Sequence, residues 1–296
     1  MIKSVRIHRL EGQYNDDLKL VLTSPEISQG FAVQSIDGLG PGSATYNTTE
    51  WSTIDGSHDD SVHIPHREIT FNLLLTDLNV YRNDTIEDVR VRSYKYFPRK
   101  KSVRLTFEMG NGKYYIDGIV TGNEPDIFQK QESQKITINC SDPYFKSETL
   151  DKYYLSELVD MFEFPFAIEE TPGVPLGELI RTKSILVTNK SDVEVGAIFH
   201  IVSNGSASNI TITNETNGQI MVLECTTHAG EEIIVDTRKG HKSIKASDGT
   251  DLMNYYSLGS DWIELAPGDN DLSFDADSGF NNLSVWFSVR MIYDGI

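Results

Sequence analysis

The sequence predicts a mainly β protein of two domains, with one helix in the first domain and a β-sandwich as the second. Three observations lead to this prediction. The chain has 296 residues, enough for two domains that each bury a core. Short segments of alternating apolar and polar residues, separated by Gly, Pro and Asn turn signals, occupy most of its length. Only one segment, 84–97, carries clear start and stop signals of a helix.

The first domain contains several short strands. The best of them alternates so that Ile69, Phe71 and Leu73 share one face. Residues from about 37 to 62 are polar and Gly-rich, and we interpret them as a long loop. A hairpin turn is expected at Gly110-Asn111-Gly112. The expected strands are 2–10, 18–22, 67–75, 102–108, 114–121 and 135–139.

The helix expected over 84–97 has a defined beginning and end. Asp84 or Thr85 can cap its first turn, and Pro98 stops it. Acidic residues lie in the first turn, near the positive end of the helix dipole. The residues expected on its buried face are Ile86, Val89, Tyr94 and Phe97.

The regular pattern breaks between about 142 and 175, where aromatic and proline residues accumulate. We therefore expect a first domain over 1–148, a linker over 149–175 and a second domain over 176–296. Nine short strands at the spacing typical of a β-sandwich, of the jelly-roll type, are expected in the second domain. They are 185–188, 196–202, 209–213, 219–225, 232–236, 243–246, 262–265, 271–274 and 283–293.

Charge is distributed unevenly along the chain. The formal net charge is -18, with 17 basic against 21 acidic residues in 1–148 and 9 against 23 in 149–296. An acidic second half argues against a specific nucleic-acid partner, because phosphate binding requires clustered Lys and Arg. One basic run exists, between residues 90 and 104, and it suits a solvated helix face or a protein contact. Its candidates for a subunit interface are Arg92, Lys95, Arg99, Lys100 and Lys101.

No signal for export or membrane insertion is found. The first residues alternate polar and apolar types, and no stretch approaches 18 uninterrupted apolar residues. The two cysteines, Cys140 and Cys225, fall in different expected domains. We expect both to be buried, reduced and unlinked, and too few to form a cysteine metal site.

The sequence offers little catalytic chemistry. It contains neither a Gly-x-Ser-x-Gly motif nor a phosphate-binding Gly-rich loop, so no catalytic residue and no cofactor is expected. Residues 55–66 contain three His and three Asp, and the turns 248–251 and 269–271 resemble pieces of calcium loops. Pro65 breaks the first pattern and the others lack a full ligand set, so solvated or subunit-contacting loops are favoured over metal sites.

Sugar binding is the main alternative. A β-sandwich with exposed aromatic rings can stack on sugar faces, and Tyr255, Tyr256 and Trp262 are the candidate contacts. The simpler interpretation, which we favour, is that these rings pack in the core or beneath a loop. Because Asp and Glu are abundant, a surface-polysaccharide hydrolase is kept as a third hypothesis.

A series of short motifs, in order, resembles the distal tail proteins of siphophages over nearly the whole chain. In the first domain these motifs are 37–41 (DGLGP), 55–56 (DG), 67–69 (REI), 89–90 (VR) and 140–145 (CSDPYF). In the second they are 187–194 (VTNKSDVE), 210–214 (ITITN), 230–232 (GEE), 235–237 (VDT), 265–270 (LAPGDN) and the end 293–296 (YDGI). Ser191 departs from the family pattern, which has Gly after the Asn-Lys pair, and this bears on the shape of a turn.

The resemblance implies a structural protein of a long, non-contractile tail. It implies that the first domain forms a homo-hexameric ring and that a galectin-like or carbohydrate-module-like second domain lies outside it. The implied neighbours are the tail tube protein and a tail-tip or tail-associated fibre protein, with a receptor-binding protein or a host glycan as a further partner. The protein would be assembled in the bacterial cytoplasm and reside in the virion tail. The alternative is a carbohydrate-binding adhesion module on the virion.

Assembly through the first domain also suits the charge distribution. A ring requires repeated head-to-tail surfaces, which a β domain with a long loop and a charged helix can supply. The first half is nearly neutral, whereas copies of the second half, at about -14, would repel one another around an axis. We expect residues 1–148 alone to form a ring and residues from about 175 onward to be monomeric.

Overall fold

The computed structural model describes the chain except residues 12–16, 23, 25–27, 53–54, 56, 78–83, 156, 160–177 and 181–183, and gives only the backbone of 157–159 and 178–180. The described residues form two compact units. Unit 1 comprises Met1–Thr149 together with Ile292–Ile296, and unit 2 comprises Leu150–Met291.

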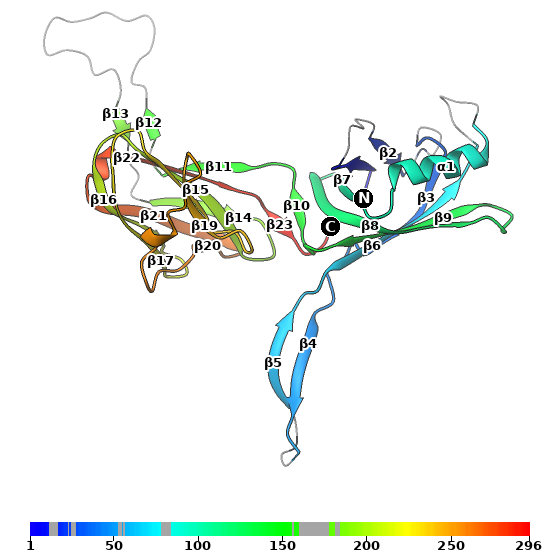
Figure 1. The fold of residues 1–296 in the computed structure, drawn as a ribbon, viewed down its shortest axis with the longest axis horizontal. Helices are drawn as coiled ribbons and strands as arrows, with labels where there is room; N and C mark the ends of the chain where they lie inside the picture. The colour runs from blue at the N-terminus through cyan, green and yellow to red at the C-terminus, as the bar shows by residue number, and fades with distance from the viewer. Residues whose placement is uncertain are drawn as a thin grey trace, which may run out of the picture. The chain divides into compact units, whose positions relative to one another are not determined.

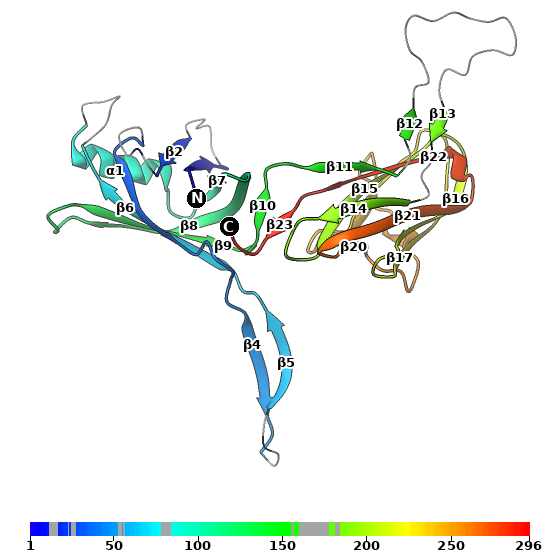
Figure 2. The ribbon, with the colours of Figure 1, turned by 180° about the vertical axis from the view of Figure 1, so that it is seen from behind.

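Unit 1 is built on one antiparallel sheet with the strand order β2-β1-β7-β8-β9-β6-β3. A short strand β10 pairs with β8 and with the C-terminal strand β23. The C-terminus therefore returns to the sheet of the first unit (Figures 1 and 2). The strands are β1 (Ser4–Arg9), β2 (Leu18–Val21), β3 (Phe31–Asp37), β6 (Arg67–Leu75), β7 (Ser102–Glu108), β8 (Lys113–Asp126), β9 (Ser133–Cys140), β10 (Phe145–Ser147) and β23 (Ile292–Tyr293).

The helix α1 (Ile86–Tyr96) covers one face of this sheet (Figure 1). Thr85 caps it and exchanges hydrogen bonds with Asp88, which forms a capping box. The expected buried positions Val89 and Phe97 are fully buried, and Ile86 is partly buried against the same core. Tyr94 was wrongly expected there: its side chain is 44% exposed, because the helical period places Ser93 and Tyr96 on the inner face instead.

The expected long loop between 37 and 62 is instead largely a hairpin. Strands β4 (Thr45–Glu50) and β5 (Ser57–His63) pair antiparallel and extend away from the sheet as an arm (Figures 1 and 2). All residues of both strands are exposed. The residues of the arm show no alternation of apolar and polar types, because the arm has no buried face. Polar pairs such as Asn47 with Ser61 link its strands instead.

Unit 2 contains two larger antiparallel sheets arranged as a β-sandwich (Figure 1). One has the order β11-β22-β15-β18-β19 with β20 beside β15, and the other has the order β14-β21-β16-β17. In the long strands buried and less buried residues alternate, as expected when each sheet has one core face. The first sheet comprises β11 (Asp151–Tyr154), β15 (Val195–Ser203), β18 (Glu232–Asp236), β19 (Ser243–Ala246), β20 (Glu264–Leu265) and β22 (Leu283–Val289).

The second sheet comprises β14 (Ser184–Asn189), β16 (Ala207–Asn214), β17 (Gln219–Thr227) and β21 (Gly268–Ser278). A separate pair, β12 (Glu157–Val159) and β13 (Glu178–Ile180), and two 3-10 turns, η2 (Met253–Tyr255) and η3 (Phe280–Asn282), complete the described part of the unit. None of the helices in the described part of the chain has the length and apolar composition required to cross a bilayer.

The predicted fold class, mainly β with one α-helix and a second β-sandwich domain, is confirmed. The units differ from the expected boundaries in two places. Residues Ile292–Ile296 lie in unit 1, because β23 pairs with β10 and the Ile296 amide donates to the Leu39 carbonyl at 3.0 Å. Residues 151–154 of the expected linker form β11 in unit 2, and most of the remaining linker lies outside the described residues.

Candidate assembly surfaces

Arg67 lies at the point in unit 1 where the arm leaves the sheet, and its side chain is only 4% exposed. Its guanidinium has five N–H groups, and the structure shows five hydrogen bonds from them. Nε donates to the Pro143 carbonyl at 2.6 Å, and Nη1 donates to the carbonyls of Gly38 and Gly40. Nη2 donates to both the backbone carbonyl and the carboxylate of Asp294.

The Arg67 cluster thus joins four segments that are distant in sequence. Its guanidinium also lies 4.9 Å from the ring centroid of Phe145. Burial lowers the pKa of Arg67, and the Asp294 carboxylate acts in the opposite direction. Gly38 fits here because its φ is +87° and an added Cβ would meet the Glu68 carbonyl oxygen at 2.1 Å. The cluster fixes the base of the arm relative to the sheet.

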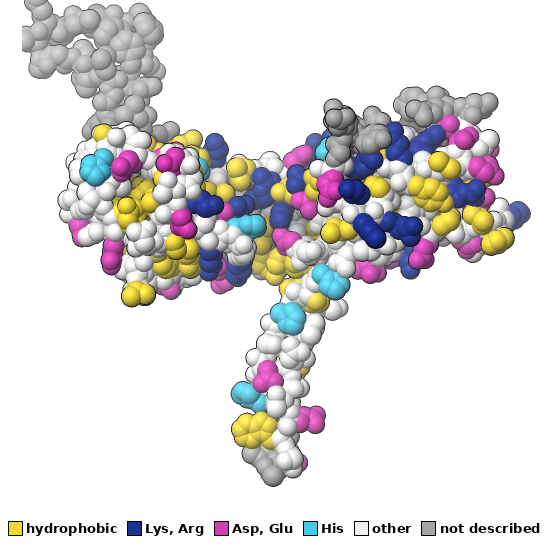
Figure 3. Space-filling view, in the orientation of Figure 1, with side chains coloured by type: hydrophobic (Ala, Val, Ile, Leu, Met, Phe, Trp, Pro, Cys, Tyr) yellow, Lys and Arg dark blue, Asp and Glu magenta, His cyan; other side chains and the backbone are white. Residues whose placement is uncertain are grey.

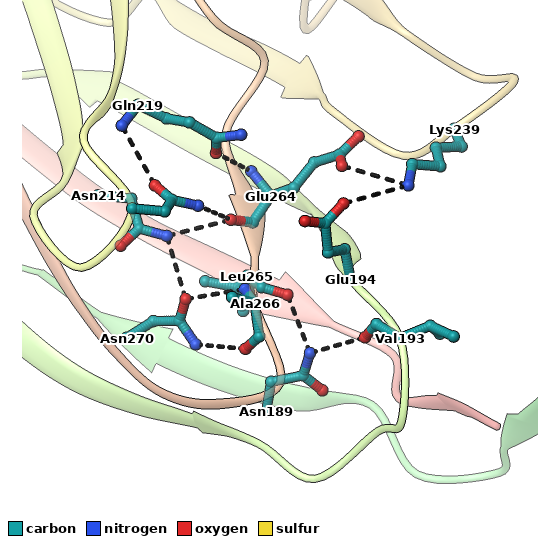
Figure 4. A network of polar contacts seen from close by, with 11 residues as sticks. Asn189, Val193, Glu194, Asn214, Gln219, Lys239, Glu264, Leu265, Ala266 and Asn270 are labelled. Carbon is teal, nitrogen blue, oxygen red and sulfur yellow. Dashed lines mark hydrogen bonds and ion pairs between the residues drawn. The ribbon is translucent and has the colours of Figure 1, made fainter.

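A second polar network holds the end of the sandwich together in unit 2 (Figure 4). Its centre is formed by three buried asparagines, Asn189, Asn214 and Asn270. Asn270 accepts from the Ala266 amide at 2.9 Å and donates back to the Ala266 carbonyl at 2.7 Å. Asn214 donates to Asn270 Oδ1 at 3.1 Å and to the Glu264 carbonyl at 3.0 Å. The network satisfies backbone groups where β14, β16, β20 and β21 end or turn.

Several motifs on which the family resemblance rests therefore meet in these two networks. Gly38, Gly40, Arg67, Pro143 and Asp294 form the first, and the asparagine network combines residues of 187–194, 210–214 and 265–270. Ser191, which departs from the family pattern, is buried, and its amide donates to Asn189 Oδ1 at 2.8 Å. The role of these motifs in the structure is to fix loops and strand ends.

The five basic interface candidates do not form one surface. Arg92 turns inward: its side chain is 10% exposed, pairs with Asp84 and donates to the Gln29 carbonyl at 2.7 Å. Lys101 is exposed and pairs with Glu11 at 3.0 Å. Because Arg92 has internal partners, it supports the helix in its own chain.

Lys95, Arg99 and Lys100 are exposed near the C-terminal end of α1. Beside them is a hollow of about 330 Å³, lined by Tyr94, Phe97, Arg99 and Asn123. Asn123 comes from β8 and donates to the Phe97 carbonyl at 3.1 Å, which caps the end of the helix. Figure 3 shows Lys and Arg side chains beside hydrophobic ones over the end of unit 1 that holds α1.

The predicted sugar-contact residues lie together in unit 2, but their rings are partly used internally. Tyr256 and Trp262 stack on each other with centroids 4.7 Å apart, and Lys242 lies 5.5 Å from the Trp262 centroid. The Tyr256 hydroxyl donates to the Ser260 carbonyl at 2.7 Å, and burial raises the pKa of that hydroxyl. Tyr255 is half-buried. All three side chains are partly exposed, and their use as sugar contacts stays a prediction.

A second aromatic row, which sequence reasoning missed, crosses the other sheet of unit 2. Tyr154, Trp286 and His200 face one another on β11, β22 and β15. The His200 and Trp286 rings are parallel with centroids 3.7 Å apart, and Lys152 lies 5.0 Å from the Trp286 centroid. His200 therefore covers one face of the Trp286 ring, and Tyr154 lies beside that ring with centroids 6.4 Å apart. The three residues were too far apart in sequence to be recognised as a row.

No metal centre is formed by the part of the chain that the structure describes: no three His, Cys, Asp or Glu side chains are grouped for one. The histidines of 55–66 are spread along and beyond β5, with His58 opposite Thr49 and His63 opposite Thr45. Cys140 and Cys225 are free, buried and in different units.

Comparison with known proteins gives a match for unit 2. Residues 190–290 match the family described as siphovirus-type tail component, C-terminal domain. These residues lie within unit 2, so the similarity to this family falls on the β-sandwich. The resemblance to siphophage tail proteins is thereby confirmed.

Among solved structures, the phage SPP1 Dit protein, described as a paradigm of the hub adsorption apparatus in phages that infect Gram-positive bacteria, matches with a TM-score of 0.63. The match covers 97% of this chain and 99% of that one at 16% identity, so both units share in the likeness. A chain of the phage P2 baseplate in its activated conformation with Ca gives a TM-score of 0.46, 14% identity and full coverage of both chains. A search of curated proteins gave no match. The chain has the fold of a Dit-like tail hub protein.

Proposed function

We propose that this chain is a structural distal tail protein of a long-tailed, non-contractile phage. Six copies would form a hub that joins the tail tube to the baseplate or tail tip used in host adsorption. The observation that carries the proposal is the fold likeness to the SPP1 hub protein, which extends over nearly the full length of both chains. The tail-component match of residues 190–290 supports it independently.

The arm in unit 1 favours a function in assembly. A two-stranded hairpin without a core is marginally stable in water. The arm nevertheless exposes Tyr46 and Val62, which lie opposite each other on its two strands, and Trp51 near its tip. Their side chains are 55%, 61% and 58% exposed. Contact with another copy or with a neighbouring tail protein would cover these side chains and stabilise the arm.

The Arg67 cluster supports the same role, because it holds the base of the arm in place. Burying a charged group is costly unless it is paired and hydrogen-bonded, as Arg67 is. A projecting arm with a fixed base can present its surface in the same direction in every copy, which a closed ring requires. The partners we propose are further copies of the chain, the tail tube protein and a tail-tip or fibre protein.

Light scattering coupled to size exclusion tests the proposal. One chain has a mass of 33.3 kDa, so a hexamer would have a mass of about 200 kDa. We expect this mass over a range of concentrations, and rings by negative-stain electron microscopy. A monomer at every concentration would contradict the proposed assembly. The Leu258→Ala variant is a control and should give the same mass as the unaltered chain. Its fully exposed side chain lies in the peripheral unit of the proposed hub.

A further inference from the structure

The hairpin formed by β8 and β9 ends in two exposed hydrophobic residues, Ile127 and Phe128. Their side chains are 42% and 95% exposed. A single exposed hydrophobic residue needs no explanation. Here, however, two consecutive ones occupy the connection at the end of a 14-residue strand, and no described residue of their own unit covers Phe128. We call residues 124–132 the fingertip.

The fingertip is held by contacts at its base. Glu132 pairs with Arg90 of α1 at 2.8 Å, where both side chains are largely buried, and the Leu75 amide donates to the Glu132 carbonyl at 3.0 Å. Gln134 is buried and donates to Asn123, which in turn caps the helix. These contacts position the fingertip relative to α1, so Phe128 is presented at a defined place at little further cost in entropy.

The hollow beside α1 has the properties of a receptor for such a side chain. It is lined by Tyr94, Phe97, Arg99 and Asn123 and has a volume of about 330 Å³. A cavity of roughly 150 Å³ is enough to hold a benzene ring. Phe97 is fully buried, so Tyr94, Arg99 and Asn123 form the accessible surface of the hollow, and the Arg99 guanidinium can stack on an aromatic ring that enters.

Phe128 of a chain does not fill the hollow of the same chain, as its exposure shows. Asn123, which lines the hollow, and Phe128 are five residues apart on one extended strand and its connection, so they are separated by up to about 17 Å. None of the residues that line the hollow belongs to the fingertip, so the two are different surfaces. A contact between the fingertip of one copy and the hollow of the next is head-to-tail, the type that generates closed rings.

Charge complementarity favours the same pairing. Apart from Glu132 and Lys101, which pair within their own chain, the fingertip carries Glu124, Asp126 and Lys130. The end of α1 carries Lys95, Arg99 and Lys100 and no acidic residue between 95 and 101. Glu124 and Lys100 are both exposed and available to face a partner. We propose that Phe128 of one copy inserts between Tyr94 and Arg99 of the next copy. The proposal rests on the hexameric function proposed above and names one of its contacts.

A first test removes the aromatic ring. Phe128→Ala should leave the thermal unfolding of the chain unchanged, since Phe128 is exposed, but should weaken association about 30-fold or more, as loss of an aromatic anchor does. Phe128→Leu should recover part of the association, and Leu258→Ala should have no effect. If the unaltered chain forms rings and Phe128→Ala forms them at the same concentration, this contact is wrong while the proposed function stands. If the unaltered chain is a monomer, the function itself fails.

A second test locates the contact directly. A photoreactive benzophenone analogue of phenylalanine at position 128 should give covalent dimers on illumination of the assembled full-length chain. Mass spectrometry should place the linkage within residues 94–99 or at Asn123. Linkage to another region, or only within one chain, would overturn the assignment. Arg99→Ala combined with Phe128→Ala should weaken association by less than the sum of the two single effects, because both act on one contact.

Discussion

Arg67 in β6 and Asp294 near the C-terminus are joined by two hydrogen bonds from the same guanidinium nitrogen, one to the Asp294 backbone carbonyl and one, at 3.3 Å, to its carboxylate. The two residues are 227 positions apart in sequence. The chain therefore leaves unit 1, forms the whole of unit 2 and returns to complete a buried ion pair. Unit 2 is an insertion between β10 and β23, and the folding of unit 1 depends on both ends of the chain.

Replacement of Arg67 should destabilise unit 1 strongly. Arg67→Ala leaves four carbonyl groups and the Asp294 carboxylate without their donor, and breaking a buried pair costs on the order of 3–5 kcal/mol. Urea unfolding measures this cost. The control is Arg104→Ala: Arg104 pairs with Asp117 at 2.7 Å on the surface, and its loss should cost less than about 1 kcal/mol. Equal effects of the two changes would contradict the importance assigned to the cluster.

This relationship also changes what is expected of a truncated chain. Residues 1–148 alone lack β23 and Asp294, so Arg67 would keep a buried charge without its partner. The ring expected from residues 1–148 should accordingly require residues 292–296 as well, joined after residue 149 by a short linker. The sequence did not indicate this dependence, because a two-residue strand such as β23 carries no pattern of its own.

The strands could be predicted where one face is buried. Strand β6 has Ile69, Phe71 and Leu73 fully buried, and this alternation is visible in the sequence. The arm could not be predicted, because both of its faces are polar and exposed. The hollow beside α1 and the Arg67 cluster are each formed by segments that are distant in sequence and come together only in the folded chain. The sequence therefore indicated the basic residues in and after α1 but could not separate the inward Arg92 from the outward Arg99.

The two cysteines should be unreactive in the folded protein. Burial raises the pKa of Cys140 to about 12 and that of Cys225 to about 11, so the reactive thiolate is scarce at pH 8. Labelling with a thiol reagent should be slow for the native chain and should reach two thiols per chain after unfolding. Both thiols are neutral in the folded and the unfolded chain below about pH 8.5, so the raised pKa values do not change the free energy of unfolding there. Above this pH the thiols ionise in the unfolded chain before they do in the folded chain, so the free energy of unfolding should fall. Rapid native labelling at pH 8 would contradict this.

The asparagine network should stabilise unit 2. Asn270→Ala removes the acceptor of the Ala266 amide and the donor to the Ala266 and Gly268 carbonyls, and each buried group left unsatisfied costs about 1–3 kcal/mol. We expect a loss of about 3 kcal/mol in the free energy of unfolding of unit 2, followed by denaturant titration. Asn204→Ala is the matched control, because Asn204 is exposed and its side-chain bond to Ser284 is long, at 3.4 Å. An equal loss in the free energy of unfolding at both positions would contradict the stabilising role assigned to the buried asparagine network.

The arm should be required for assembly and dispensable for folding. Thr45 and His63 are directly paired at its base, so residues 45–63 can be replaced by a short Gly-rich turn without moving the flanking chain. Because every residue of β4 and β5 is exposed, the free energy of unfolding of unit 1 should change by no more than about 0.5 kcal/mol. The mass by light scattering should fall from that of the hexamer toward that of one chain.

A milder variant tests whether the exposed apolar pair of the arm is required for the ring. Tyr46→Ser with Val62→Thr keeps both strands but removes the exposed apolar pair, and it should weaken the ring without unfolding the chain. Val91→Thr is the matched control, since Val91 is 62% exposed on the helix and lies outside the arm. If rings still form at the same concentration after deletion of the arm, the arm is not required for assembly. A large loss of stability on deletion would show that it belongs to the folded core.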